Sequence, residues 1–135
     1  MHKIYLGLGS NLGNRKENLA YAIRFIGERV GKVLRVSSFI ETEPWGFESE
    51  NTFVNAVILC ETDLTPRQLL GATQKIEREM GRQKKSTDGG YSDRCIDIDI
   101  LLYDNLRVDE PDLQIPHPLM LERDFVMIPL GEIRD

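Results

Sequence analysis

Two amphipathic helical segments, each preceded and followed by apolar strand-like segments, constrain the fold of this chain more than any other feature. The first helical segment starts after the capping residue Asn14 and ends before Gly31. The second starts after Thr65, a favoured N-cap residue, and ends at Gly81. Apolar or alternating runs typical of strands occupy residues 3–9, 32–40, 53–60 and 94–104. The order of the elements is therefore β-α-β-β-α-β.

This order predicts an α+β fold of the ferredoxin-like kind. In that arrangement two helices cover one face of an antiparallel sheet, and the other face stays open and can carry an active site. The 135 residues show no internal repeat, so we expect one domain that spans residues 1–135.

The predicted strand RCIDIDILLYD (residues 94–104) is unusual because it carries two aspartates among apolar residues. Side chains alternate between the two faces of a strand, so Asp97 and Asp99 point the same way, and the alternating isoleucines Ile96, Ile98 and Ile100 point toward the helices. One interpretation is a solvated sheet face. The other is a bound divalent cation, because two like charges on one face repel each other. Mg²⁺ prefers one or two carboxylates together with phosphate oxygens, and Mn²⁺ could replace it.

Basic side chains gather near a second long polar loop and in the C-terminal tail. Those that could contact a polyphosphate are Arg82, Lys84, Lys85, Arg94, His117 and Arg123. The alternative is a solvated basic loop and an incidental histidine between two prolines. The stretch GLGSNLGN (residues 7–14) lacks the ending of a P-loop, and it predicts a tight turn from strand to helix.

Asn55 lies inside an otherwise apolar strand, and a buried amide needs hydrogen-bond partners. The backbone could satisfy it. Alternatively its donor and acceptor could recognise a flat heterocycle, with Phe53, Trp45 and Phe125 as stacking rings. Only the tertiary structure can bring these groups together.

The charge and composition limit the classes of function. The formal net charge of −5 argues against a broad nucleic-acid interface, which would need a basic surface. Cys60 and Cys95 lie far apart in apolar runs, so we expect reduced, buried thiols in a cytoplasmic protein. No apolar run approaches the roughly 20 residues of a membrane span, and no signal peptide is apparent. A non-catalytic domain that binds a small molecule or a metal stays possible.

Six segments in this order and at this spacing resemble the 6-hydroxymethyl-7,8-dihydropterin pyrophosphokinase family of folate biosynthesis. They are YLGLGSNLGN, SSFIETEPWG, FVNAVILCET, TPRQLLGATQKIEREMGR, DRCIDIDILLYD and IPHPLMLERDFVMIPL. The resemblance implies a ferredoxin-like core and transfer of pyrophosphate from ATP to the pterin hydroxymethyl group, giving AMP and the pterin diphosphate. It also implies two Mg²⁺ ions, ATP and 6-hydroxymethyl-7,8-dihydropterin as partners, no nucleic acid or membrane, and a monomer.

The same resemblance implies roles for individual residues. The implied catalytic residues are Arg82, Arg94, Asp97 and Asp99, of which Asp97 and Asp99 bind the metal. The implied pterin contacts are Thr42, Trp45, Phe53, Asn55, Tyr91 and Phe125. The implied nucleotide contacts are Gln74, Glu77, Lys84, Arg94, His117 and Arg123.

Several positions depart from the family pattern. Glu43 replaces a proline, Pro118 replaces a residue that is tyrosine in some members, and Lys84 stands where an arginine also occurs. The sequence YSDR (residues 91–94) stands where a Gly-Pro-Arg type sequence is typical. We also expect the chain to be shorter at its C-terminus than typical members.

Overall fold

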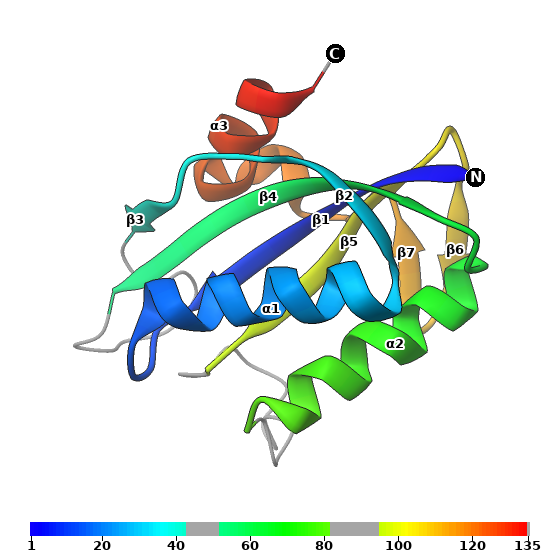
Figure 1. The fold of residues 1–135 in the computed structure, drawn as a ribbon. Helices are drawn as coiled ribbons and strands as arrows, with labels where there is room; N and C mark the ends of the chain where they lie inside the picture. The colour runs from blue at the N-terminus through cyan, green and yellow to red at the C-terminus, as the bar shows by residue number, and fades with distance from the viewer. Residues whose placement is uncertain (43–51, 82–94, 135) are drawn as a thin grey trace.

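The computed structural model describes residues 1–42, 52–81 and 95–134 (Figure 1). In chain order, its elements are β1 (His2–Ser10), α1 (Arg15–Arg29), β2 (Gly31–Val36), β3 (Ile40–Thr42), β4 (Phe53–Thr62), α2 (Pro66–Glu79), β5 (Asp97–Tyr103), β6 (Val108–Glu110), β7 (Leu113–Ile115), the 3₁₀ turn η1 (Met120–Glu122) and α3 (Asp124–Ile133).

The main sheet has the strand order β2-β4-β1-β5, and all of its neighbouring strands are antiparallel. Strand β3 pairs with β4 beyond the end of β2, and β6 pairs with β7 in a separate ribbon. Strand β4 lies between β1 and β2, and β1 lies between β4 and β5. This is the split βαβ order of a ferredoxin-like fold, so the predicted fold class is confirmed. The segment predicted as one strand, residues 32–40, forms β2 and the start of β3.

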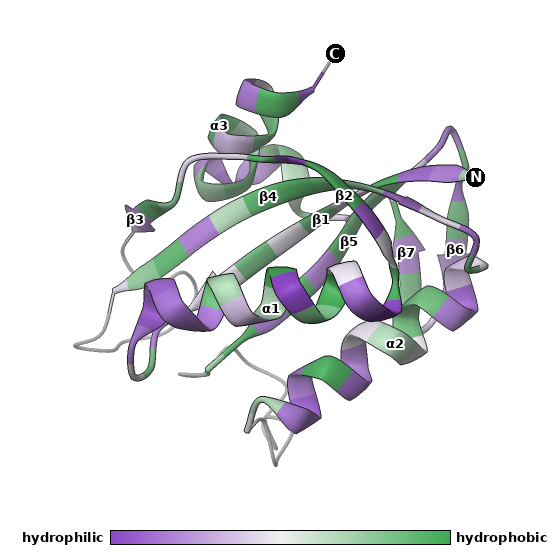
Figure 2. Ribbon diagram, in the orientation of Figure 1, coloured by the Kyte–Doolittle hydropathy of each residue, from purple (hydrophilic) through white to green (hydrophobic). Residues whose placement is uncertain are grey.

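Both helices begin where the sequence predicted. The Asn14 side chain accepts a hydrogen bond from the Glu17 backbone N–H at 3.2 Å. Thr65 forms a full capping box with Gln68, which satisfies the backbone N–H groups of both residues. Hydrophilic and hydrophobic residues alternate along α1 and α2 (Figure 2). This amphipathic pattern lets each helix bury one side against the sheet.

The larger core lies between these two helices and the sheet. Alternate residues of β1, β4, β5 and β7 point into it, and they pack against the apolar stripes of α1 and α2. Its fully buried members include Ile4, Leu6, Leu19, Ile26, Ile58, Leu69, Ile76 and Ile96. Burial of so much apolar surface is the main force that stabilises the fold.

The opposite face of the sheet differs in part from the prediction, which placed helices on one face only. Helix α3 packs there, and the apolar residues Val57, Leu59 and Leu101 of the sheet form a second cluster with Val126 and Leu130 of the helix. The part of the face that these sheet residues form is apolar, and the C-terminal tail packs over it because burial removes this apolar surface from water. Among the described elements, no helix packs on the other half of the face, near the N-terminal end of β5.

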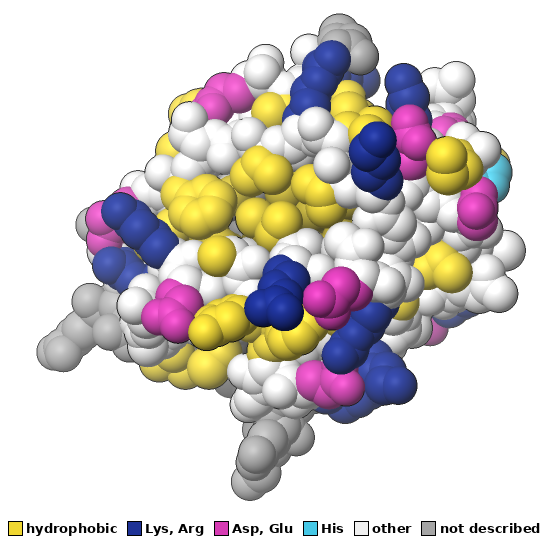
Figure 3. Space-filling view, viewed as in Figure 1, with side chains coloured by type: hydrophobic (Ala, Val, Ile, Leu, Met, Phe, Trp, Pro, Cys, Tyr) yellow, Lys and Arg dark blue, Asp and Glu magenta, His cyan; other side chains and the backbone are white. Residues whose placement is uncertain are grey.

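The outer surface carries interspersed charges. On the face shown in Figure 3, Lys and Arg side chains stand beside Asp and Glu side chains, around a group of apolar side chains above α1. Within residues 1–42, 52–81 and 95–134, none of the helices has the length and hydropathy that a membrane crossing requires.

Candidate active site

The site is built on a row of residues that crosses the uncovered part of the sheet. In the strand register, Gly9 of β1 pairs with Asn55 of β4 on one side and with Asp97 of β5 on the other. Directly opposite residues share a face, so the side chains of Asn55 and Asp97 point the same way across Gly9. Gly7 occupies the equivalent position beside Asp99. Because the central strand has no side chains at these two positions, the sheet surface is hollow between the flanking strands.

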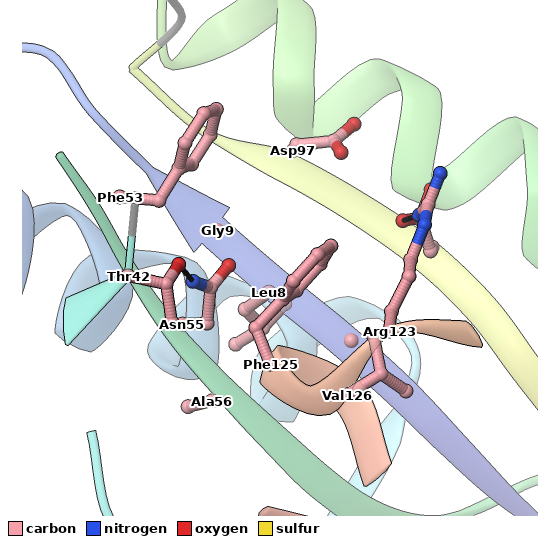
Figure 4. Close-up of a pocket in the computed structure, with 12 residues that line it drawn as sticks. Leu8, Gly9, Thr42, Phe53, Asn55, Ala56, Asp97, Arg123, Phe125 and Val126 are labelled. Atoms are coloured by element: carbon pink, nitrogen blue, oxygen red, sulfur yellow. Dashed lines mark hydrogen bonds and ion pairs between the residues drawn. The ribbon is translucent and has the colours of Figure 1, made fainter. Parts of the chain in front are cut away.

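The resulting pocket gathers residues from four strands and the tail (Figure 4). Its lining residues are Gly7, Leu8, Gly9, Thr42, Phe53, Asn55, Ala56, Asp97, Asp99, Arg123, Phe125 and Val126. The rings of Phe53 and Phe125 stand on either side of Gly9, and the Asn55 amide lies between their bases. The sequence therefore predicted residues that the fold brings together, although they lie up to about 80 positions apart in the chain.

The Asn55 amide hydrogen-bonds to another side chain, and not to the backbone as one of the two interpretations had it. It is only 5% exposed, and its Nδ2 donates to the Thr42 hydroxyl at 2.7 Å. A Cβ atom added at Gly9 would lie 2.8 Å from the Asn55 Oδ1 and 3.4 Å from the Phe53 ring. Such a contact is too close, so glycine keeps the floor of the pocket open and leaves the amide undisturbed.

The acidic wall of the pocket faces two basic side chains, the buried Arg123 and the half-buried His117. The Arg123 guanidinium lies 3.7 Å from the Asp99 carboxylate, and the His117 Nε2 lies 3.9 Å from it. Arg123 is only 3% exposed, and burial lowers its pKa from the ordinary value. Its guanidinium also lies 5.5 Å from the Phe125 ring centroid. Arg123 therefore links the aromatic wall of the pocket to the acidic wall.

His117 is oriented by the backbone around it. Its backbone N–H donates to the Leu101 carbonyl at 3.1 Å, and the Leu119 N–H donates to its Nδ1 at 3.3 Å. An Nδ1 that accepts a hydrogen bond leaves the proton on Nε2, the atom that faces Asp99. Burial lowers the pKa of His117, and the nearby charge of Asp97 opposes that effect. The ring therefore acts as a neutral Nε2–H donor near pH 7.

A second hollow lies beyond the aspartates, between α2 and the β6–β7 ribbon. It is lined by Leu70, Ile98, Asp99, Ile100, Pro111, Asp112, Leu113, Gln114, His117 and Pro118. Asp99 lines this hollow and the pocket over Gly9 as well. The pocket over Gly9 and this second hollow thus meet at Asp99 on β5, where a ligand in one could contact a ligand in the other.

Two predicted nucleotide contacts lie on α2. The buried carboxylate of Glu77 accepts the Ile98 backbone N–H at 2.9 Å. It therefore satisfies a backbone donor on the outer edge of β5, which holds the aspartate-bearing strand against α2. Gln74 is half-buried, about one turn earlier on the same helix.

Several predicted residues fall in the parts of the chain outside the described residues. They are Trp45, Arg82, Lys84, Tyr91 and Arg94, together with the departures Glu43, Ser92 and Asp93. Among the described residues, no group of three or more His, Cys, Asp or Glu side chains could enclose a metal. Two carboxylates on one strand suit Mg²⁺, which takes its other ligands from water and phosphate.

Sequence reasoning missed the role of the glycines. Residues 3–9 were predicted as a strand, and Gly7 and Gly9 do lie in β1, but their place in the floor of the pocket was not predicted. The signal was their alternation in LGLGS, because two glycines on one face of a strand leave that face bare. The apolar residues Leu8, Ala56 and Val126, which also line the pocket, were not predicted from the sequence.

Fold and site together define a ferredoxin-like domain that holds an acidic ligand pocket on the uncovered part of its sheet. Comparison with known proteins narrows this class to one family. The family model for 7,8-dihydro-6-hydroxymethylpterin-pyrophosphokinase (HPPK) matches residues 5–135, and the chain belongs to this family. Its function is that of the family, the transfer of pyrophosphate from ATP to hydroxymethyldihydropterin in folate synthesis.

Individual relatives agree with this assignment. The chain is 51% identical over 131 residues to the 2-amino-4-hydroxy-6-hydroxymethyldihydropteridine pyrophosphokinase of Porphyromonas gingivalis, which covers 96% of this chain and 89% of the relative. It is 40% identical over 130 residues to the Bacillus subtilis enzyme of the same name, with 96% and 76% covered. A crystal structure of a Plasmodium falciparum HPPK-DHPS triple mutant has a TM-score of 0.74 at 17% identity. That match covers 96% of this chain and 40% of the other, and it shows the fold.

Proposed function

We propose that the pocket over Gly9 binds the pterin. Magnesium and the ATP triphosphate would lie beside Asp99, where this pocket meets the second hollow. The observation that carries this proposal is the placement of the Asn55 amide, two aromatic rings and two carboxylates around one glycine floor. The second hollow, which reaches His117 and Pro118, would then hold the nucleoside part of ATP.

The chemistry of the pterin suits the first pocket. A pterin is flat and aromatic, with donors and acceptors around its edge, so rings such as Phe53 and Phe125 can stack on its faces. The buried amide of Asn55 offers a fixed acceptor and donor to its polar edge. Thr42 fixes the rotation of that amide through the 2.7 Å hydrogen bond. Trp45 and Tyr91 are proposed as further pterin contacts.

The metal assignment rests on the donor set. Asp97 and Asp99 supply two hard oxygen ligands from a rigid strand, and substrate phosphates would complete the shell of two Mg²⁺ ions. When bound, Mg²⁺ neutralises charge on the triphosphate and lowers the pKa of a hydroxyl that contacts it. The position of Asp97 beside the pterin pocket would direct the pterin hydroxymethyl group toward the triphosphate.

Cationic and donor groups would stabilise the charge that develops during transfer. The electrophile is the β-phosphorus, because the leaving group is AMP. Arg123 and the Nε2–H of His117 flank Asp99 and can contact phosphate oxygens from the protein side. Arg82 and Arg94 are proposed for the same task, and Gln74, Glu77 and Lys84 for nucleotide contacts. Catalysis would then consist mainly of positioning and electrostatic stabilisation.

We also propose a cytoplasmic monomer. In support, Cys60 and Cys95 are free thiols, which suits a reducing compartment. Cys60 is buried as expected, and burial raises its pKa to about 12, whereas Cys95 is only half-buried.

Titration calorimetry tests the substrate assignment. A non-hydrolysable ATP analogue should bind the wild-type protein well only with Mg²⁺, and the pterin should then bind the binary complex. Asp97→Asn should weaken the Mg²⁺-dependent part of analogue binding, and Asn55→Ala should weaken pterin binding. Asp109→Asn, an exposed position on β6, is the matched control and should change neither. Analogue binding that is equally tight with and without Mg²⁺ would overturn the metal assignment.

A further inference from the structure

A group of three polar side chains lies at the rim of the proposed pterin pocket and outside the reaction chemistry described above. The Arg15 Nη1 lies 3.0 Å from the Glu41 carboxylate and donates to the Thr52 carbonyl at 2.9 Å. It also contacts the Thr52 hydroxyl, and that hydroxyl donates to Glu41 at 2.7 Å. The three residues therefore form a closed set of contacts, which we call the Arg15 clasp.

The clasp joins the chain segments that carry two walls of the pocket. Glu41 precedes Thr42, and Thr52 precedes Phe53, and Thr42 and Phe53 both line the pocket. These two lining residues are the last pair of the β3–β4 ladder. Strand β3 has only three residues and pairs only with β4 among the described strands. So short a strand gains little stability from its own ladder, and side-chain contacts become important for its position.

The position of Arg15 in its helix is a second observation. Arg15 is the first residue of α1, where the helix dipole disfavours a positive charge. A residue that opposes a local preference is often retained for a contact elsewhere. Glu41 supplies that contact, because its hydrogen bond from Thr52 and the adjacent Arg15 guanidinium lower the pKa of its carboxyl group. The Glu41 carboxylate is therefore charged near neutral pH.

We infer that Arg15 is a positioning residue for the pterin pocket. Through Glu41 and Thr52 it holds Thr42 and Phe53 at the spacing that Asn55 and the flat ligand require. The inference rests on the proposed pterin site, and it assigns no contact between Arg15 and either substrate. Its effect is modest because the clasp is partly exposed, with 30% of the Arg15 and 57% of the Glu41 side chain accessible.

The test compares Arg15→Ala with Arg24→Ala by steady-state kinetics. Arg24 lies on the same helix and forms an exposed ion pair with Glu28, so it is a matched control. Arg15→Ala should raise the KM for the pterin roughly three- to fivefold, while kcat and the KM for ATP stay within about twofold. Arg24→Ala should change none of these constants. An unchanged pterin KM in Arg15→Ala would overturn the inference.

Further variants separate positioning from general support of the fold. Glu41→Gln should produce a similar rise in pterin KM, and the double variant should be little worse than either single variant because both remove the same contact. Arg15→Lys keeps the charge and should restore part of the loss. If the melting temperature falls and pterin and ATP affinities weaken together, Arg15 has only a structural role and the inference is wrong.

A failure of the pterin site itself would look different. In that case Asn55→Ala and Phe53→Ala would also leave the pterin KM unchanged. If those two variants lose pterin affinity and Arg15→Ala does not, the site assignment stands and only the positioning role of Arg15 is refuted.

Discussion

The two faces of the sheet have opposite tasks, and strand β5 belongs to both. Ile98 and Ile100 are each 6% exposed and point into the core beneath the helices. Asp97 and Asp99, the residues that alternate with them, line the pocket on the other face. A shift of one residue in the chain thus separates groups that stabilise the fold from groups that face a ligand.

The rigidity of the site comes from the helix-covered face of the sheet. The helix-covered face gives the strands a fixed register, and the uncovered half of the other face can then carry charges and glycines that contribute little to stability. Glu77 belongs to the supporting side, because it reaches from α2 to the backbone of β5. We therefore expect substitutions on one strand to affect either stability or activity, depending on the face.

The largest expected effect is the loss of turnover in Asp97→Asn or Asp99→Asn. Removal of one carboxylate charge should lower kcat by at least about 10²–10³-fold, because the metal and the developing phosphate charge are then poorly stabilised. The melting temperature should stay near that of the wild type. Activity comparable to wild type in either variant would contradict the metal role, and Asp109→Asn is the control at an exposed strand position.

The opposite result is expected one residue away. Ile96 is fully buried beneath the helices, so Ile96→Ala should lower the free energy of unfolding by about 2–4 kcal/mol. Denaturant titration measures this, and the folded enzyme should retain nearly the wild-type kcat/KM. Ile128→Ala, at a position that is 57% exposed on α3, should cost less than about 0.5 kcal/mol. Similar losses in the two variants would show that the buried face is not the main source of stability.

Gly9→Ala tests the floor of the pocket. The added Cβ would lie 2.8 Å from the Asn55 Oδ1, so we expect pterin binding to weaken by about 1–3 kcal/mol, roughly five- to 150-fold. The control is Gly71→Ala in α2, where nothing lies within 4 Å of the added atom. That change should leave binding unaltered and stabilise the protein by about 0.5–1 kcal/mol. Calorimetry with the pterin would refute the floor assignment if both variants bound alike.

The smallest expected effect concerns pH. Burial lowers the pKa of His117 in the folded protein, so below about pH 6.5 the unfolded chain takes up this proton first. Stability from the neutral ring is therefore present above about pH 6.5 and decreases as the pH falls below it. Without Mg²⁺, His117→Gln should flatten this part of the melting-temperature profile. An identical slope in the wild type and the variant would refute this contribution of His117 to the pH dependence of stability.

Much of the fold could be predicted because the signals are local. The caps at Asn14 and Thr65 and the apolar periodicities fixed both main helices and the strand order. The cover of the second face by α3 could not be predicted, since it depends on which half of that face is apolar once the strands are paired. The same holds for the division of residues 32–40 between β2 and β3.

For the site, the sequence alone determined the chemistry of single residues: two carboxylates on one strand face, an amide in an apolar strand, and basic and aromatic groups in the tail. Only the tertiary structure decided that Asn55, Gly9 and Asp97 form one row, and that Arg123 and His117 face Asp99. The physical reason is that residue type and alternation are local properties of a chain. The spacing between strands, and the hollow that two glycines leave between them, exist only after long-range pairing.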